Sequence, residues 1–173
     1  MNTCPIQIKR VMAIDPVTRG FGFVVFEGPE QLVDWAVVET KANKESRSLR
    51  RVADLFVRYR PDVLVLEDPT GRGSRRCARV RKLLDKVERV AAKESVVVRR
   101  LSRGRVRRAF SGSGAKTKYE IAGEIAKRFP ELVPRLPRFR KPWMTEDDRM
   151  SLFDAASFGL TYFYFAGRRK LQI

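Results

Sequence analysis

Histidine is absent from this sequence of 173 residues, and cysteine occurs only twice, as Cys4 and Cys77. Without histidine there can be no histidine general base, no Ser-His-Asp triad and no Cys/His zinc site. Two cysteines do not form the disulfide framework of a small secreted protein. Catalysis or metal binding by this chain therefore has to rely on other side chains, and carboxylates and lysines are the main candidates.

Long apolar runs are also missing. The most apolar stretch, residues 152–167, contains Asp154 and is shorter than the roughly 20 residues of a membrane-spanning helix. The first residues lack the apolar core of a secretory signal. We therefore expect an intracellular protein without a membrane anchor, and we expect residues 152–167 to form a buried helix.

Acidic residues are scarce relative to basic ones, with 20 Asp and Glu against 37 Lys and Arg, a formal net charge of +17. So large a positive charge attracts polyanions, of which nucleic acid is the commonest. The alternatives are a solvated cationic surface without a partner and attraction to an anionic membrane. The composition favours nucleic acid as the partner.

The pattern of apolar residues predicts a single α/β domain over residues 1–173. Period-two and continuous apolar runs predict strands, and helical spacing predicts helices around them. Three antiparallel strands followed by alternating helix and strand imply a five-stranded mixed sheet with helices on both faces. The expected strands are 10–15, 21–26, 32–40, 63–66 and 95–100. The expected helices are 44–60, 75–93, 102–110, 116–129 and 148–165, with a basic, proline-rich loop at 130–143.

Three acids stand at the ends of apolar elements or inside them. Asp15 and Glu67 each close an apolar strand, and Asp154 lies within the apolar last helix. Each alone has an ordinary explanation, as a turn residue, a strand end or an ion-pair partner. Together in one region of low dielectric they would repel one another unless a cation neutralised them. Hard oxygen ligands select Mg²⁺ or Mn²⁺, and a pair of such ions about 3.5–4 Å apart hydrolyses phosphodiesters without histidine.

Four segments of the chain resemble RuvC-type Holliday junction resolvases, over about residues 10 to 165. Residues 15–22 (DPVTRGFG) resemble the first-strand signature, and residues 65–67 (VLE) resemble the strand that ends in a glutamate. Residues 112–118 (GSGAKTK) are similar to the Gly-x-Gly loop that leads to a lysine, for which Lys118 is the better match. Residues 154–156 (DAA) resemble the last-helix motif.

The resemblance implies an RNase H-like fold, a homodimer, Mg²⁺ dependence with Mn²⁺ as a substitute, and paired nicks across a four-way DNA junction. It makes Asp15, Glu67 and Asp154 catalytic metal ligands. It makes Lys118 a candidate catalytic residue that contacts the scissile phosphate or stabilises charge there; the alternative is a solvated lysine at the start of a helix. It also implies a location where DNA is held: the cytoplasm or nucleoid, an organelle or a viral compartment.

The sequence departs from the family pattern in two places. Family members usually carry a fourth acid three or four residues before the last aspartate, where this chain has Ser151 and Met150. We choose Asp147 as the fourth catalytic metal ligand, with Asp148 as the alternative; either could instead be the N-cap of the last helix. Family members also often place a junction-wedging aromatic after the glutamate, whereas residues 68–73 here read DPTGRG.

Clusters of arginine and lysine supply candidate contacts to phosphate, which arginine recognises without reading bases. Helix 75–93 also has an apolar face, which by resemblance forms the dimer interface and alternatively packs on the chain's own sheet. Phe139 or Trp143 could stack on an unpaired base or belong to the core. The candidate nucleic-acid-binding residues are Arg75, Arg76, Arg79, Arg105, Arg108, Lys116, Arg138 and Arg140.

These observations predict a structure-selective DNA endonuclease that cuts four-way junctions. Two alternatives keep the same fold: an RNA-processing nuclease like the YqgF branch of the superfamily, and a non-catalytic nucleic-acid-binding module. Metal-dependent cleavage separates the two nucleases from the binding module, and substrate preference separates the nucleases from each other.

Overall fold

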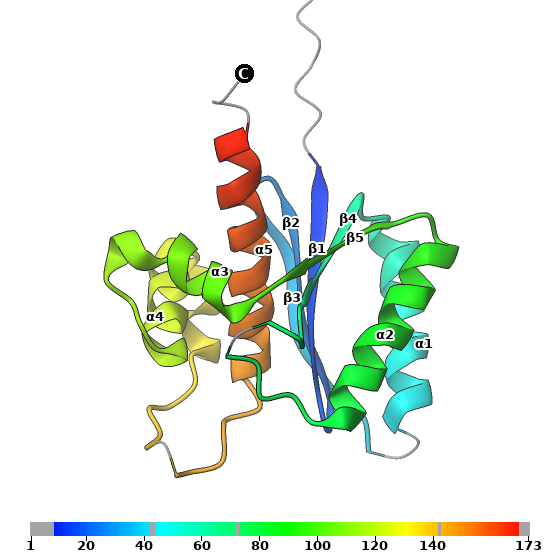
Figure 1. The fold of residues 1–173 in the computed structure, drawn as a ribbon, viewed down its shortest axis with the longest axis horizontal. Coiled ribbons are helices and arrows are strands. Elements are labelled where there is room, and N and C mark those ends of the chain that lie inside the picture. Colours follow the sequence, from blue (N-terminus) through cyan, green and yellow to red (C-terminus); the bar gives the residue numbers. More distant parts are fainter. Residues whose placement is uncertain (1–8, 42–43, 72, 142, 170–173) are drawn as a thin grey trace, which may run out of the picture.

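A computed structural model describes residues 9–41, 44–71, 73–141 and 143–169. Its centre is one five-stranded sheet with the strand order β3-β2-β1-β4-β5 (Figure 1). Strands β1, β2 and β3 are antiparallel neighbours, while β4 lies parallel to β1 and β5 parallel to β4. The strands are β1 (Arg10–Val17), β2 (Gly20–Glu27), β3 (Leu32–Glu39), β4 (Val63–Glu67) and β5 (Val97–Leu101).

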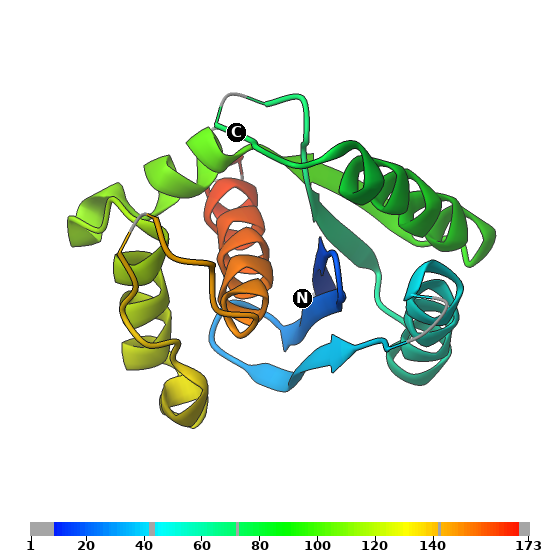
Figure 2. The same ribbon diagram turned by 90° about the horizontal axis from the view of Figure 1, so that it is seen from below.

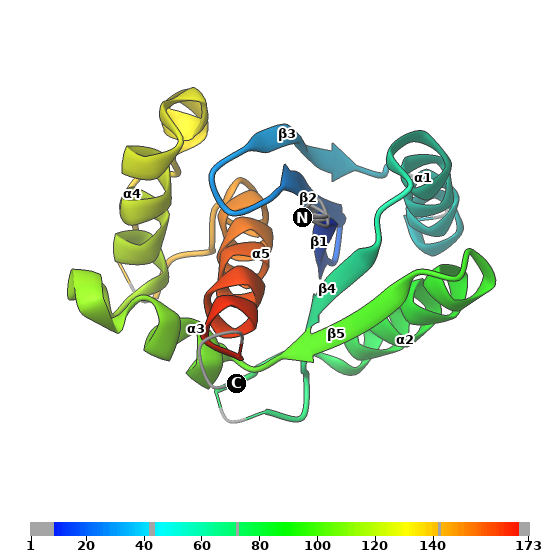
Figure 3. The ribbon, with the colours of Figure 1, turned by 90° about the horizontal axis from the view of Figure 1, so that it is seen from above.

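Helices cover both faces of this sheet, as Figure 1 and Figure 3 show. On one face lie α1 (Lys44–Tyr59) and α2 (Ala78–Lys93), and on the other α3 (Arg103–Ala109), α4 (Lys118–Arg128) and α5 (Met150–Arg169). Figure 2 shows α5 lying between α4 and the sheet, and α5 contacts β1, β2 and β4. The predicted α/β fold class, with its mixed five-stranded sheet, is confirmed.

The alternation of side chains along β1 and β4 divides the core into two layers. Even-numbered residues such as Met12 and Leu64 pack toward α1 and α2. Odd-numbered ones, such as Ala13 and Val65, pack toward α3, α4 and α5. Successive residues of a strand point to opposite faces of the sheet. The same parity directs Asp15 and Glu67 toward α5.

Several predicted elements differ from the structure in their bounds; α5, for example, ends at Arg169 rather than at residue 165. Helix α2 begins at Ala78 rather than at residue 75, so Arg75 and Arg76 lie in the irregular segment before it. No acid stands in the first turn of α2, and Cys77, an exposed free thiol, makes no side-chain cap. The predicted loop 130–143 begins with a short 3₁₀ helix, η2 (Pro130–Arg135). A second 3₁₀ turn, η1 (Ser111–Ser113), precedes α4.

The apolar face of α2 is covered within the chain. Its residues Val80, Leu83, Leu84, Val87 and Ala91 are buried in the core layer shared with α1 and the sheet. This outcome matches the second interpretation of that face, packing on the chain's own sheet. Across the described ranges, no helix is both long and apolar enough to cross a membrane.

Candidate active site

Three buried carboxylates converge between the sheet and the start of α5. Asp15 lies in β1, Glu67 is the last residue of β4, and Asp154 is in the second turn of α5. The exposed fractions of these side chains are 1%, 1% and 5%. Because β1 and β4 are parallel neighbours, their carboxyl ends lie at one edge of the sheet. The three acids are brought together as the sequence predicts.

A glycine of β2 permits α5 to approach this edge. Gly22 pairs with Asp15 across the β1–β2 ladder. A Cβ atom on Gly22 would lie 2.3 Å from the carbonyl carbon of Ser151. A side chain there would therefore push the start of α5 off the sheet. Since Ser151 precedes Asp154 by less than one turn, the absence of a side chain at Gly22 fixes how closely Asp154 approaches Asp15.

Arg103 contacts all three acids. Its Nη1 donates to Asp154 Oδ1 at 2.6 Å, and its Nη2 donates to Asp154 Oδ2 and Glu67 Oε2, both at 3.0 Å. Asp15 Oδ1 lies 3.8 Å from the same Nη2. The guanidinium also lies over the Phe158 ring, 4.8 Å from its centroid. Arg103 thus neutralises the acids from the centre of the cluster.

Arg76 completes the neutralisation from the other side. It hydrogen-bonds Asp15, donates from Nε to Glu67 Oε2 at 2.7 Å and reaches the Pro16 carbonyl at 3.2 Å. The side chain is only 14% exposed. The structure therefore places this predicted nucleic-acid contact inside the acid cluster, where its donors are already used.

Lys118 joins the cluster from the start of α4. Its ammonium donates to Asp154 Oδ2 at 2.9 Å and to Glu146 Oε1 at 2.8 Å. The helix begins here because Thr117 and Glu120 form a capping box. Burial lowers the pKa of Lys118, but the charges of Asp154 and Glu146 outweigh it and raise the pKa above its usual value. Lys118 is therefore a fixed positive charge beside Asp154.

The acids differ in protonation behaviour. Burial raises the pKa of Asp15 to about 7; the charge of Arg76 opposes this rise and that of Asp154 adds to it. Burial also raises the pKa values of Asp154 and Glu67, but neighbouring cations lower these pKa values by more. Arg103 and Lys118 lower the pKa of Asp154 to about 2, and Arg103 and Arg76 lower the pKa of Glu67. Asp15 is therefore the acid whose charge is least compensated.

This difference predicts how stability depends on pH without metal. A carboxyl with a raised folded pKa stabilises below its unfolded pKa, near 3.8, and this contribution is lost as pH rises toward about 7. We expect the free energy of unfolding to fall between pH 4 and 7 by on the order of a few kcal/mol. With no histidine in the sequence, little else titrates near neutrality.

Urea unfolding at closely spaced pH values checks this expectation. The variant Asp15→Asn, which cannot titrate at this position, should lack that part of the decline. A decline of equal size in both proteins would show that Asp15 is not its source.

The two candidates for the fourth acid, Asp147 and Asp148, differ from the clustered acids in their surroundings. Asp147 is held by Arg149, with two side-chain contacts at 3.0 and 2.8 Å, and lies 3.7 Å from Arg140. The hydrogen bonds from Arg149 lower the pKa of Asp147 to about 2. Asp148 is exposed. Glu146, in the same segment, pairs with Lys118, which also pairs with Asp154.

The chemistry of the donor set suits a hard divalent cation, because three carboxylates offer oxygen ligands from rigid elements. In the arrangement observed, however, Arg76 and Arg103 take up those oxygens. Among the described residues, no three His, Cys, Asp or Glu side chains are spaced to hold a metal ion. Asp15, Glu67 and Asp154 therefore match Mg²⁺ or Mn²⁺ in donor type. To hold an ion, their carboxylates would have to close around it as the two guanidiniums move aside.

A basic cavity of about 360 Å³ opens beside Asp154. Its walls include Arg75, Arg107, Lys116 and Lys118, with Arg103 at the acid cluster. Five cations around one carboxylate favour an anionic ligand such as phosphate. Two predicted nucleic-acid contacts, Arg75 and Lys116, thus lie next to the acids.

The remaining predicted contacts are exposed on three other segments. Arg79 is on α2, and Arg105 and Arg108 are on α3, where Arg105 lies over the Phe165 ring at 4.9 Å. Arg138 and Arg140 are exposed on the segment between η2 and α5, and Arg140 donates to the Thr145 carbonyl at 2.8 Å. Their positions permit contact with a long polyanion.

Sequence reasoning missed Arg103 and Glu146 as members of this site. A signal for Arg103 was present. It follows β5 closely, and β5 is the parallel neighbour of β4, so a residue there returns to the edge that carries Glu67. Glu146 had no comparable signal, because its approach to Lys118 depends on the path of an irregular segment.

Comparison with known proteins supports this architecture. No protein-family model and no curated protein matches the sequence. Among solved structures, Thermus thermophilus RuvC matches with a TM-score of 0.69 and 23% identity, over 92% of this chain and 96% of that chain. The same protein in complex with a Holliday junction substrate matches with a TM-score of 0.69 and 22% identity, over the same shares.

The yeast mitochondrial Holliday junction resolvase Ydc2 matches with a TM-score of 0.65 and 13% identity, over 95% of this chain and 82% of that chain. The resemblance seen in the sequence motifs is thereby confirmed at the level of structure. This chain has the RNase H-like fold of the RuvC-type resolvases.

Proposed function

We propose that this protein is a metal-dependent endonuclease that cuts four-way DNA junctions. One observation carries the proposal: three buried carboxylates from separate elements meet at the edge of a strongly basic cavity. Buried acids are costly to keep, and an oxygen-rich cluster beside a phosphate-binding surface suits phosphodiester hydrolysis. The likeness in fold to RuvC and Ydc2 supports the same reaction class.

Each residue has a role in this proposal. Asp15, Glu67 and Asp154 would hold Mg²⁺ or Mn²⁺, as one ion or two. Bound there, such ions activate water and stabilise the leaving oxygen. Lys118 would contact the scissile phosphate and stabilise charge that develops on it. Asp147, chosen because the motif position carries no acid, stays the proposed fourth ligand, with Asp148 as the alternative; Glu146 is the acid that shares Lys118 with Asp154.

Arg76 and Arg103 would couple DNA binding to metal binding. Both guanidiniums form ion pairs with the carboxylates. A DNA phosphate in the neighbouring cavity offers them an alternative partner, since arginine binds phosphate as readily as carboxylate. Arginines drawn to the backbone would free the acids for metal ligation.

The same ion pairs favour a second candidate function. If the guanidiniums stay on the acids when DNA binds, the protein is a non-catalytic nucleic-acid-binding module with a neutralised site. An RNA-processing nuclease is the alternative that keeps the metal site and changes the substrate.

The proposal includes a homodimer, because paired nicks across a junction require two sites. The apolar residues of α2 that are buried in the chain's own core would not form its interface, so a dimer would use other surfaces. An enzyme acting on junctions would work in an intracellular compartment that contains DNA.

Cleavage assays on three substrates test the proposal. A labelled four-way junction, a matched linear duplex and a structured RNA are each incubated with Mg²⁺, Mn²⁺ or EDTA. We expect paired nicks in the junction with either metal and none with EDTA. Cleavage of RNA alone would support the RNA-processing nuclease, and tight binding without cleavage in any metal would support the binding module.

A further inference from the structure

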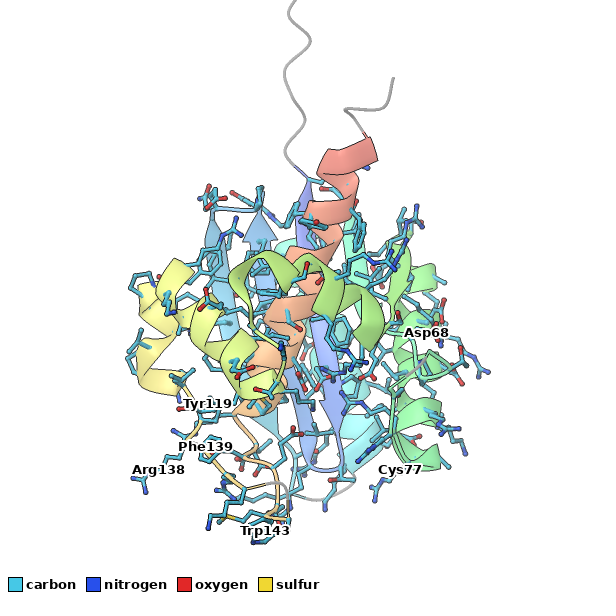
Figure 4. The ribbon with its side chains drawn as sticks, turned by 60° about the vertical axis from the view of Figure 1, so that its left-hand side comes forward. Asp68, Cys77, Tyr119, Arg138, Phe139 and Trp143 are labelled. Carbon is cyan, nitrogen blue, oxygen red and sulfur yellow. The ribbon has the colours of Figure 1, made fainter. Side chains whose placement is uncertain are left out.

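Large apolar side chains of the segment between η2 and α5 are exposed to solvent. Trp143, Phe139 and Met144 have exposed fractions of 78%, 69% and 51%. Burial of such groups is the rule in a folded chain, and a cluster of exposed ones marks a surface that contacts something else. Figure 4 shows Phe139 beside Tyr119, with Trp143 at the extremity of the molecule.

Cations alternate with these aromatic side chains. Arg138, Arg140 and Lys141 occupy the positions around Phe139, and the Lys141 ammonium lies 5.2 Å from the centroid of the Trp143 ring. Stacking surfaces next to phosphate-binding cations are the features with which proteins hold single-stranded nucleic acid. Neither a basic surface nor an apolar one alone would discriminate a nucleotide from other ligands.

Phe139 and Tyr119 lie on a groove next to the candidate active site, and Trp143 is on the same segment as Phe139. This groove, of about 440 Å³, is lined by Phe139, Met144 and Arg140 on one side and by Lys118 and Tyr119 on the other. The Phe139 ring packs edge-on against Tyr119 with the centroids 5.4 Å apart. Lys118 also lines the basic cavity beside Asp154, so this lysine borders both the groove and the cavity.

We propose that Phe139 and Trp143 stack on unpaired bases of branched DNA, next to the strand that is cut. This inference rests on the proposed function and adds the part of the substrate that is recognised. A phosphate on Lys118 would leave the adjoining nucleotides in the groove, which Phe139 lines. Phe139 there, and the exposed Trp143 on the same segment, would stack on bases that a fully paired duplex keeps in its helix. The groove therefore selects DNA with bases free to leave the stack, such as a junction centre.

Binding measurements without metal test the inference separately from cleavage. A four-way junction with 2-aminopurine near its centre, the same junction without the probe and a linear duplex are titrated in EDTA. We expect Phe139→Ala and Trp143→Ala each to weaken junction binding about tenfold to a hundredfold. The 2-aminopurine quenching seen with the wild type should fall in both variants, and duplex binding should change little.

Salt dependence separates stacking from charge. Removal of a ring should leave the slope of log Kd against log salt unchanged, whereas Arg138→Gln should reduce it by about one. The matched control is Val133→Ala, an exposed apolar residue on η2, which should bind as the wild type does. Light scattering on each variant shows whether the aromatic residues instead join two copies of the chain.

Three results would overturn the inference: unchanged junction affinity in both ring variants, equal weakening for duplex and junction, or weakening explained by loss of a dimer. Wild-type protein that binds no DNA at all would overturn the proposed function as well. Wild-type binding with unaffected ring variants would overturn the stacking inference alone.

Discussion

Asp15→Asn is expected to abolish metal-dependent junction cleavage, with a rate loss of at least about a thousandfold. Asparagine keeps the size of the side chain but removes the negative charge that a divalent ion requires. Because metal ligands act as a unit, the loss should approach that of the metal-free reaction. Junction binding should be retained or slightly tightened, since the substitution removes a negative charge near the phosphate path.

A matched control lies on the same edge of the sheet. Asp68 follows Glu67 directly, but its carboxylate is turned to the Thr70 hydroxyl at 2.7 Å and the Thr70 amide at 2.9 Å. Asp68→Asn should therefore cleave nearly as fast as the wild type. Rates are measured as single turnovers on a labelled junction, with binding measured in EDTA. Equal activity of Asp15→Asn and the wild type would contradict the proposed metal site.

Arg103→Gln is expected to destabilise the metal-free protein by about 3–5 kcal/mol. Arg103 contacts all three buried acids, and its removal leaves more negative charge in the site than Arg76 and Lys118 compensate. Exposed ion pairs are worth far less, but this guanidinium is only 13% exposed and the acids are nearly fully buried. The cost is the burial of carboxylates without their partner.

Divalent metal should restore part of this loss. Without the competing guanidinium, Mg²⁺ or Mn²⁺ can take the vacated oxygens, and a ligand that binds only the folded state raises the free energy of unfolding. The gain on adding metal should be larger for Arg103→Gln than for the wild type, where the ion must first displace Arg103. Urea unfolding with and without metal measures both effects.

The control for this pair of measurements is Arg108→Gln. Arg108 is an exposed arginine of the same helix α3, and its replacement should change stability by no more than about 0.5 kcal/mol, with no response to metal beyond that of the wild type. A metal response in Arg103→Gln no larger than in the wild type would show that the acids do not form a divalent-ion site. An unchanged stability in Arg103→Gln would refute the role assigned to the guanidinium.

The sheet, most of the helices and the meeting of three acids could be predicted from the sequence. Period-two alternation in β1 and β4 directs Asp15 and Glu67 to the face that α5 covers. Such periodicity is a local property of the backbone, so it can be recognised without knowledge of distant contacts. Asp154 was recognisable for a related reason: a charged residue in an otherwise apolar helix needs a partner inside the fold.

The boundaries of the helices were harder to predict from the sequence. The basic residues Arg75 and Arg76 continue the charge pattern of α2, yet the helix starts at Ala78. No capping side chain marks the start, so neither charge nor apolar spacing could locate it. This uncertainty concealed the position of Arg76, whose segment turns back to the acids instead of facing solvent with the helix.

The identity of the cations that neutralise the acids could not be predicted from the sequence and depends on the folded arrangement. Arg76 and Asp15 are 61 positions apart, and Arg103 and Asp154 are 51 apart. With 37 Lys and Arg residues, many pairings satisfy the charge, and charge has no periodicity that would distinguish them. The structure also showed that Asp147 pairs with Arg149, that Glu146 shares Lys118, and that Phe139 and Trp143 lie outside the core. Each of these depends on the path of irregular backbone. There the distances between side chains, and not a local sequence pattern, determine which contacts are favourable.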